Sequence, residues 1–275
     1  MDYRLYCEEK VAPPGSTWYY ALRRVAPAQR DALTALQALA VELEAGVDEC
    51  SEPTVAKAKL AWWRAEIERL YQGAPQHPVL QALLPATQAY RLPREELLEL
   101  VGGAEMNVVH ARYNDLAGLR LYAERTGGTL ARLRARVLGE TSEPALKQAE
   151  ALGVALTLAG TVTEAGAHVR KGVIYWPVSE LQQFNVPAAV VSGLRDTPEL
   201  AALIRHQLGR AQQALHEWMK GLSPEQRRRQ RVHLIVARIT LATLNEIARA
   251  GAASVLNQRL SLTPLRKLWI AMTAR

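Results

Sequence analysis

Apolar residues along this 275-residue chain recur mainly at spacings of three and four, which is the period of an amphipathic α-helix. The stretch QRDALTALQALAVELEAGVDE shows this pattern clearly, and its apolar positions are Leu33, Leu36, Leu39, Val41 and Leu43. No alternating run of apolar and polar residues stands out at the length of a strand. The pattern therefore predicts an all-α protein.

Proline and glycine residues mark where the predicted helices begin and end. One helix follows residues 13–15, where Ser16 or Thr17 would cap it. Further helices are predicted after Pro53, before Pro93, over 114–139, 143–160, 200–220 and 228–251, and after Pro264, with an irregular segment at about 166–177. No stretch resembles a linker, so we expect one domain over residues 1–275.

Composition agrees with this pattern. Ala and Leu dominate, Val and Ile are scattered, and almost half of the chain is apolar, which favours helices around a sizeable core. The formal charge of +7 has two explanations. It either serves only to keep the protein soluble, or it attracts phosphates on a membrane surface or on a small anionic ligand. Because no nucleic-acid motif is present, we expect no nucleic-acid partner.

Two arginine-rich stretches carry much of this charge. Arg132, Arg134 and Arg136 are spread around one predicted helix, so we expect most of them to be solvated. The run RRRQR at 227–231 is either a solvated helix start or a contact for anionic lipid or an acidic partner.

Cysteine usage and the absence of long apolar runs indicate a cytoplasmic protein with peripheral membrane contact at most. Cys7 and Cys50 form no CxxC pair, which disfavours a zinc site, and so few cysteines suit a reducing compartment. The start MDYRLYCEEK lacks the apolar segment of a signal peptide. The longest apolar run, at about 151–162, is shorter than the roughly 18–20 residues that cross a bilayer.

Other polar and small residues leave alternatives open. Gly127 and Gly128 are costly inside a helix, and they indicate either close helix packing or a backbone that lies against a ligand. Four histidines without metal-site spacing are interpreted as structural or exposed: His110, His206, His216 and His233.

Five segments together resemble the squalene/phytoene synthase family. They occur in the family's order over about residues 6–186, and they read GSTWYYALRRVAPAQRDALTALQALAVELEAGVDE, AKLAWWRAEIERLYQGAPQHPV, EMNVVHARY, LYAERTGGTLARLRARVLG and RKGVIYWPVSELQQFNV. The resemblance implies an isoprenoid-synthase-type helical bundle around a central cavity, with isoprenoid diphosphates as ligands.

The family places carboxylates in two DxxxD motifs, whose spacing puts both acids on one helical face to hold Mg²⁺ at a departing diphosphate. Here the first motif falls at EAGVD, residues 44–48, and the second at EAGAH, residues 164–168. Further motif positions are altered: Ala45, Asn107, Ala167 and His168 stand where the family carries acids, Val41 where it carries arginine, and Gly160 where it carries asparagine.

The resemblance also implies roles for particular residues. Glu44, Asp48 and Glu164 would hold Mg²⁺, although His168 replaces an acid and an imidazole is a poor magnesium ligand. We interpret His168 as a surface or loop histidine. Tyr122 would be the functional tyrosine, and the residues for substrate binding would be Arg112, Lys171 and Tyr175.

Two hypotheses follow from the altered motifs. The first is a non-catalytic or weakened family member, a pseudoenzyme, that binds an isoprenoid diphosphate or lipid or acts in assembly, with Mg²⁺ at most near Glu44 and Asp48. The alternative is an active head-to-head prenyltransferase that condenses farnesyl or geranylgeranyl diphosphate. The stretches VELEAGVDECSEPTVAKAKLAWW and YAERTGGTLARLRARVLG also resemble a degenerate branch containing a mitochondrial complex I assembly factor, which implies a respiratory-complex assembly partner.

Overall fold

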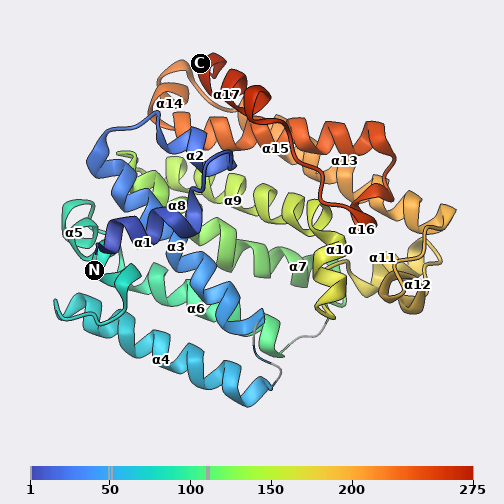
Figure 1. The fold of residues 1–275 in the computed structure, drawn as a ribbon, viewed down its shortest axis with the longest axis horizontal. Helices are drawn as coiled ribbons and strands as arrows, with labels where there is room; N and C mark the ends of the chain where they lie inside the picture. The colour runs from blue at the N-terminus through green and yellow to red at the C-terminus, as the bar shows by residue number, and fades with distance from the viewer. Residues whose placement is uncertain (1, 49, 51, 110–111, 275) are drawn as a thin grey trace.

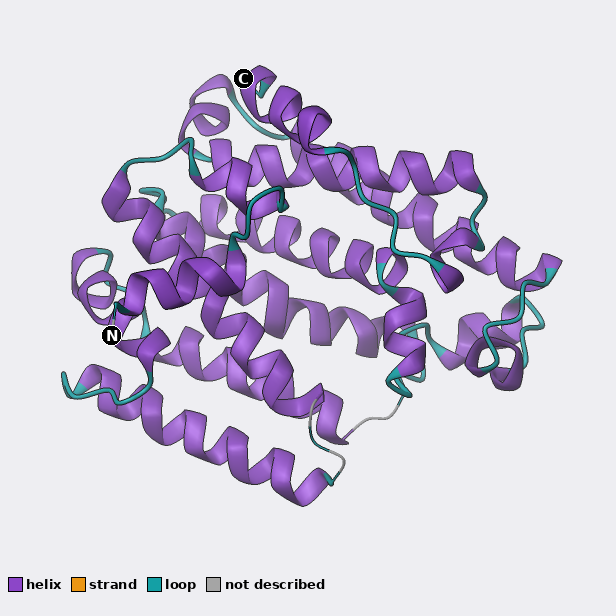
Figure 2. Ribbon diagram, viewed as in Figure 1, coloured by secondary structure: helices purple, strands orange, loops and turns teal. Residues whose placement is uncertain are grey.

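The computed structural model describes residues 2–48, 50, 52–109 and 112–274. Over these residues the chain forms helices and no named strand, as the sequence predicts (Figure 2). The helices are α1 (Tyr3–Val11), α2 (Thr17–Leu22), α3 (Pro27–Asp48), α4 (Pro53–Tyr71), α5 (Pro78–Ala89), α6 (Arg94–Val109), α7 (Leu116–Ala123), the π-helix η1 (Glu124–Gly128), α8 (Thr129–Val137), α9 (Glu143–Thr163), α10 (Ala165–Arg170), α11 (Val178–Gln183), α12 (Ala188–Ser192), α13 (Pro198–Lys220), α14 (Pro224–Arg229), α15 (Arg231–Ala250), α16 (Ser254–Asn257) and α17 (Pro264–Thr273).

The long helices run across the molecule in Figure 1, and the short helices α10, α11, α12 and α16 gather at one end. Helix α9 is central, since it packs against α8, α13 and α15. Helix α3 packs against α1, α5, α6 and α8. This arrangement carries the last turn of α3 and the junction of α9 and α10 toward the end where the short helices lie.

The periodicity of α3 explains its place in the core. Leu33, Leu36 and Leu39 are fully buried, and Leu43 is nearly so. Residues at these spacings share one face of a helix, and their burial removes a continuous apolar stripe from water. Beyond Leu43 the helix ends with the first acidic motif.

The paired glycines of the central segment serve close helix packing. A Cβ on Gly127 would lie 2.5 Å from the carbonyl oxygen of Gly153, and one on Gly128 would lie 3.1 Å from Cγ of Glu150. Both glycines therefore face α9, and the space beside them is taken by that helix. Of the two explanations left open by the sequence, close packing is confirmed.

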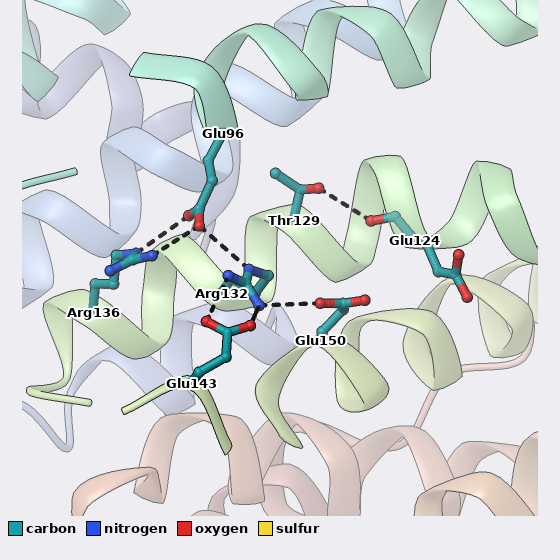
Figure 3. Close-up of polar contacts among 7 residues, drawn as sticks. All are labelled: Glu96, Glu124, Thr129, Arg132, Arg136, Glu143 and Glu150. Atoms are coloured by element: carbon teal, nitrogen blue, oxygen red, sulfur yellow. Dashed lines mark hydrogen bonds and ion pairs between the residues drawn. The ribbon is translucent and has the colours of Figure 1, made fainter. Parts of the chain in front are cut away.

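The expectation that the arginines of the central segment are mostly solvated is wrong. The side chains of Arg132 and Arg136 are 17% and 20% exposed, and Arg134 is buried with its guanidinium 4.3 Å from the ring centre of Trp18. Figure 3 shows Arg132 and Arg136 meeting acids from two other helices, which are Glu96 on α6 and Glu143 and Glu150 on α9. Helical spacing places side chains around α8, but it does not tell which faces neighbouring helices cover.

Two predicted boundaries also differ from the structure. The segment expected to be irregular contains α10, because residues 165–170 continue as a helix after Glu164. The helix predicted over 228–251 is divided into α14 and α15 at the fully buried Gln230. The start of α2 is as predicted, since the Ser16 hydroxyl accepts a hydrogen bond from the Tyr19 amide.

The cysteines and histidines lie in different environments. Cys7 and Cys50 are both free thiols. His233 is buried and His216 is exposed, while His110 lies outside the described residues. Within the described part of the chain, no helix has the length and apolar character needed to cross a bilayer.

Candidate functional site

The structure brings the three predicted carboxylates into one site. Glu44 and Asp48 lie one turn apart at the end of α3, and Glu164 lies between α9 and α10. The Glu44 side chain is exposed, yet the surrounding protein desolvates its carboxylate enough to raise its pKa, and the negative charges of Asp48 and Glu164 raise it further. The acids of the two motifs therefore lie within one another's electrostatic field.

Two cations of the chain itself hold two of these acids. The Lys171 ammonium donates to Oδ2 of Asp48 at 2.6 Å, and the Arg259 guanidinium donates to Oε1 of Glu164 at 2.6 Å. The hydrogen bond to Asp48 raises the pKa of Lys171, so this amine stays charged at neutral pH. The site thus contains its own counter-charges.

In this arrangement the three carboxylates are poor ligands for a magnesium ion. Mg²⁺ requires near-octahedral oxygen ligands at about 2.0–2.1 Å. Asp48 and Glu164 each direct an oxygen to a cation of the chain, and within the described residues no group of three or more His, Cys, Asp and Glu is arranged to hold a metal ion. Metal binding by Glu44, Asp48 and Glu164 stays a prediction.

His168 is part of the packed wall of this site, so its interpretation as a surface or loop histidine is wrong. It lies on α10, is half-buried, and meets the ring of Tyr175 edge-on at 4.8 Å between ring centres. Burial lowers its pKa, which leaves the ring neutral at neutral pH. Its Nδ1 is buried and has no hydrogen-bond partner among the described residues.

A cluster of three tyrosines lies beside the acids and is organised by Asn107. The rings of Tyr122 and Tyr175 stack with centres 5.5 Å apart. The Asn107 amide donates to the hydroxyls of Tyr122 at 3.1 Å and Tyr175 at 2.9 Å, and its carbonyl accepts from Tyr113 at 2.9 Å. An ionised carboxylate at this position has no hydrogen to donate, so the asparagine explains how these hydroxyls converge.

The tyrosine hydroxyls of this cluster remain protonated. Burial raises the pKa of Tyr122, and the nearby Glu44 carboxylate adds to the rise. Burial likewise raises the pKa values of Tyr113 and Tyr175. Tyr122 therefore lies near the first acidic motif and presents a neutral hydroxyl there.

The predicted substrate-binding residues occupy different positions. Tyr175 is buried in the tyrosine cluster, and Lys171 pairs with Asp48. Arg112 is exposed, and its backbone forms an isolated parallel bridge with Ile174, next to Tyr175. The structure therefore places Lys171 among the acids. Arg112 lies next to the segment that carries Tyr175.

The space next to this cluster is small. A cavity of about 10 Å³ lies beside α10, lined by Thr161, Ala165, His168, Val169 and residues 173–176. A hollow of about 490 Å³ lies between α1, α3 and α5, where Ala28 and Ala32 form part of its wall. Ala32 is about 18 Å from Glu44 along α3, so the larger hollow is remote from the acids.

Sequence reasoning missed two functional candidates. Asn107 stands where an acid is expected, and that departure was the only signal of its role as a hydrogen-bond donor. Arg259 lies 95 residues from Glu164, and nothing in the local sequence indicates that the two side chains meet.

Known proteins resemble this chain over most of its length. A phytoene synthase from Mycobacterium tuberculosis is 28% identical over 260 residues, which cover 94% of this chain and 85% of that relative. A dehydrosqualene synthase solved with a ligand superposes with a TM-score of 0.84 at 16% identity, covering 99% of this chain and 95% of its own. The squalene synthase HpnC from Alicyclobacillus acidocaldarius gives 0.78 at 21% identity, covering 90% and 94%. Because residues 11–266 also match the family model of Squalene/phytoene synthase, the chain belongs to this family.

Proposed function

We propose that this chain is a family member that binds an isoprenoid or related lipid beside Glu44 and Tyr175 without ionising a diphosphate, and that the cavity of about 10 Å³ there widens when the lipid enters. The observation that carries the proposal is the pairing of Asp48 with Lys171 and of Glu164 with Arg259. A magnesium ion would have to displace both cations before it gained these oxygens. The ion pairs therefore oppose the metal loading on which ionisation depends.

The charge of the site supports the same proposal. Three carboxylates face two cations, so a diphosphate without metal ions meets net repulsion. A neutral head group avoids this repulsion, and the protonated hydroxyls of Tyr122 and Tyr175 lie beside the acids as uncharged polar groups. We therefore favour a neutral isoprenoid lipid over a free diphosphate as the ligand.

Turnover is the direct test. The purified chain is incubated with farnesyl or geranylgeranyl diphosphate and Mg²⁺, and released diphosphate is measured together with binding of the corresponding uncharged isoprenoid alcohol. We expect alcohol binding and no diphosphate release above a protein-free control. Steady release that Asp48→Ala abolishes would contradict the proposal.

A second experiment tests the role of the ion pairs without relying on activity. In Lys171→Met/Arg259→Met the acids lose their partners, and titration calorimetry should show tighter Mg²⁺ binding than in the wild type. The matched control is Arg229→Met/Arg249→Met, which breaks two ion pairs elsewhere, with Glu225 and Glu246. Equal Mg²⁺ affinity in all three proteins would remove the argument from the ion pairs.

An active head-to-head prenyltransferase is the alternative, and the clustering of the acids favours it. Glu44 lies close enough to Asp48 and Glu164 for their charges to raise its pKa, and Tyr122 lies near Glu44. In this alternative the three acids hold magnesium, which would neutralise the leaving diphosphate, and Arg112 and Lys171 orient the substrate. The turnover assay with Asp48→Ala separates the two proposals.

The resemblance to a complex I assembly factor stays a prediction. A respiratory-complex partner would be recovered by affinity purification of the full chain from its own cells. Recovery of no respiratory or membrane protein would count against it.

A further inference from the structure

The C-terminal helix α17 turns an apolar stripe toward solvent. Four of its side chains are large, apolar and exposed: Leu265 at 78%, Leu268 at 42%, Trp269 at 63% and Met272 at 62%. Their spacings of three and four place them on one face. The opposite face buries Ile270 and Ala271 against the protein, so α17 is attached to the bundle and its outer face is apolar.

The helix is anchored along α15 in an antiparallel orientation. At its start, Arg266 pairs with Glu246 near the end of α15. At its end, the Thr273 carbonyl accepts from Arg238 at 3.0 Å, closer to the start of α15. The C-terminal end of α17 therefore points toward the beginning of α15, which α14 directly precedes, and Figure 1 shows α14 and α17 at the same end of the view.

The surroundings of the stripe are basic. Among the described residues after Glu246 none is Asp or Glu, and three exposed arginines follow it: Arg249, Arg259 and Arg266. Two of them, Arg249 and Arg266, share the single acid Glu246. Helix α14 adds Arg227, Arg228 and Arg229 against the single acid Glu225. An apolar stripe among cations is complementary to a surface that offers anionic head groups above a hydrocarbon interior.

We propose that α17 is an interfacial helix that docks this protein on an anionic lipid bilayer. Trp269 would lie at head-group level, where indole rings are enriched, and Leu265, Leu268 and Met272 would enter the acyl boundary. The basic residues of α14 and the C-terminal segment add electrostatic attraction. This inference is independent of whether the site at Glu44 turns over a substrate.

The size of the stripe favours lipid over a second protein copy. A stable protein interface takes about 20–30 residues from each side. The exposed face of the ten-residue helix α17 supplies only a part of that number. The cations around it would also repel the same cations of an identical partner.

Vesicle flotation tests the proposal with the full chain. Vesicles of phosphatidylcholine alone are compared with vesicles of equal parts phosphatidylcholine and phosphatidylglycerol. We expect binding to the anionic vesicles that weakens as salt is added. Leu265→Gln/Trp269→Gln should lower the partition coefficient about tenfold or more, because two exposed apolar side chains are lost.

A control variant also replaces two exposed apolar side chains with glutamine, but elsewhere on the protein. Leu5→Gln/Val55→Gln alters two side chains that are 53% and 47% exposed on α1 and α4, and it should bind like the wild type. Equal binding to both vesicle types, or undiminished binding of Leu265→Gln/Trp269→Gln, would overturn the proposal. So would light scattering that shows a wild-type dimer and a monomeric Leu265→Gln/Trp269→Gln variant, since the stripe would then be a protein interface.

Discussion

Lys171 and Asp48 are 123 residues apart in the chain, and their side chains meet at 2.6 Å where α10 and α3 end. The Lys171 side chain is 52% exposed, whereas that of Asp48 is only 11% exposed. An ion pair with one solvated member adds little to the free energy of folding. Its main consequence is electrostatic, because it neutralises one acid of the first motif at the place where a metal ion would need it.

Glu44→Gln is expected to stabilise the protein at neutral pH. Although Glu44 is exposed, desolvation by the surrounding protein raises its pKa in the folded state, and the charges of Asp48 and Glu164 raise it further, so the ionised form opposes folding. The penalty is present above the folded-state pKa and disappears as pH falls toward the unfolded-state pKa. Urea unfolding at pH 7 and pH 4 should therefore show a higher midpoint for the variant at pH 7 only.

The control for this measurement is Glu8→Gln on the exposed face of α1. It changes the net charge equally but lies away from the acidic site. A wild-type protein that is as stable as Glu44→Gln at pH 7 would show that the carboxylates do not repel one another.

The buried His233 should make the protein less stable in mild acid. Burial lowers its pKa to about 3, with a further contribution from the charge of Arg134. Below about pH 6.5 the unfolded chain takes up a proton that the folded chain does not, so stability falls as pH drops from there toward 3. The expected loss from this group is about 1 kcal/mol per pH unit in that window, measured by urea unfolding.

His233→Gln isolates this contribution. The variant loses stability at every pH, but the part of the pH dependence below 6.5 that belongs to His233 should disappear. The exposed His216→Gln should keep the wild-type slope. An unchanged slope in His233→Gln would mean that His233 is protonated in the folded protein.

The sequence predicted what depends on local spacing. The three-and-four pattern of Leu33, Leu36 and Leu39 predicted the core face of α3. The resemblance to the family implied the first acidic motif at Glu44 and Asp48, and helical spacing put both acids on one face. Both predictions need only the geometry of one helix, together with the order of the segments that resemble the family.

The parts that were missed depend on contacts between distant segments. The pairing of Arg259 with Glu164 and the hydrogen bonds from Asn107 require knowledge of how helices pack, which spacing within one helix does not contain. The same holds for Arg132, whose acids come from α6 and α9. Helix identity is encoded locally, whereas the ion pairs of the site arise from tertiary structure.

Gly153→Ala should destabilise the protein strongly. A Cβ at this position would collide with the backbone of Gly127, which neither rotamer change nor side-chain movement relieves. Overpacking of this kind costs about 1–3 kcal/mol or more. Gly209→Ala on α13 is the control, since nothing lies within 4 Å of its added Cβ, and alanine should stabilise that helix by up to about 1 kcal/mol. Thermal unfolding should thus move in opposite directions for the two variants.

Arg132→Ala should lower the free energy of unfolding by more than the loss of a solvated charge on a helix surface would. Its guanidinium lies 3.3 Å from Glu96, 3.0 Å from Glu143 and 3.2 Å from Glu150, so one side chain joins α6, α8 and α9 (Figure 3). The Glu96 side chain is only 16% exposed, and without Arg132 it keeps Arg136 as a partner. We expect a loss of about 2 kcal/mol in the free energy of unfolding, less than the 3–5 kcal/mol for a fully buried charge left without a partner.

Two further variants decide whether the loss comes from the network. Arg120→Ala removes an exposed pair with Glu124 and should cost at most about 0.5 kcal/mol. Glu96→Gln should cost less in the Arg132→Ala background than in the wild type, because the two side chains share one contact. Additive effects in this double-mutant cycle would show that Arg132 stabilises the helices through its aliphatic packing rather than through its charge.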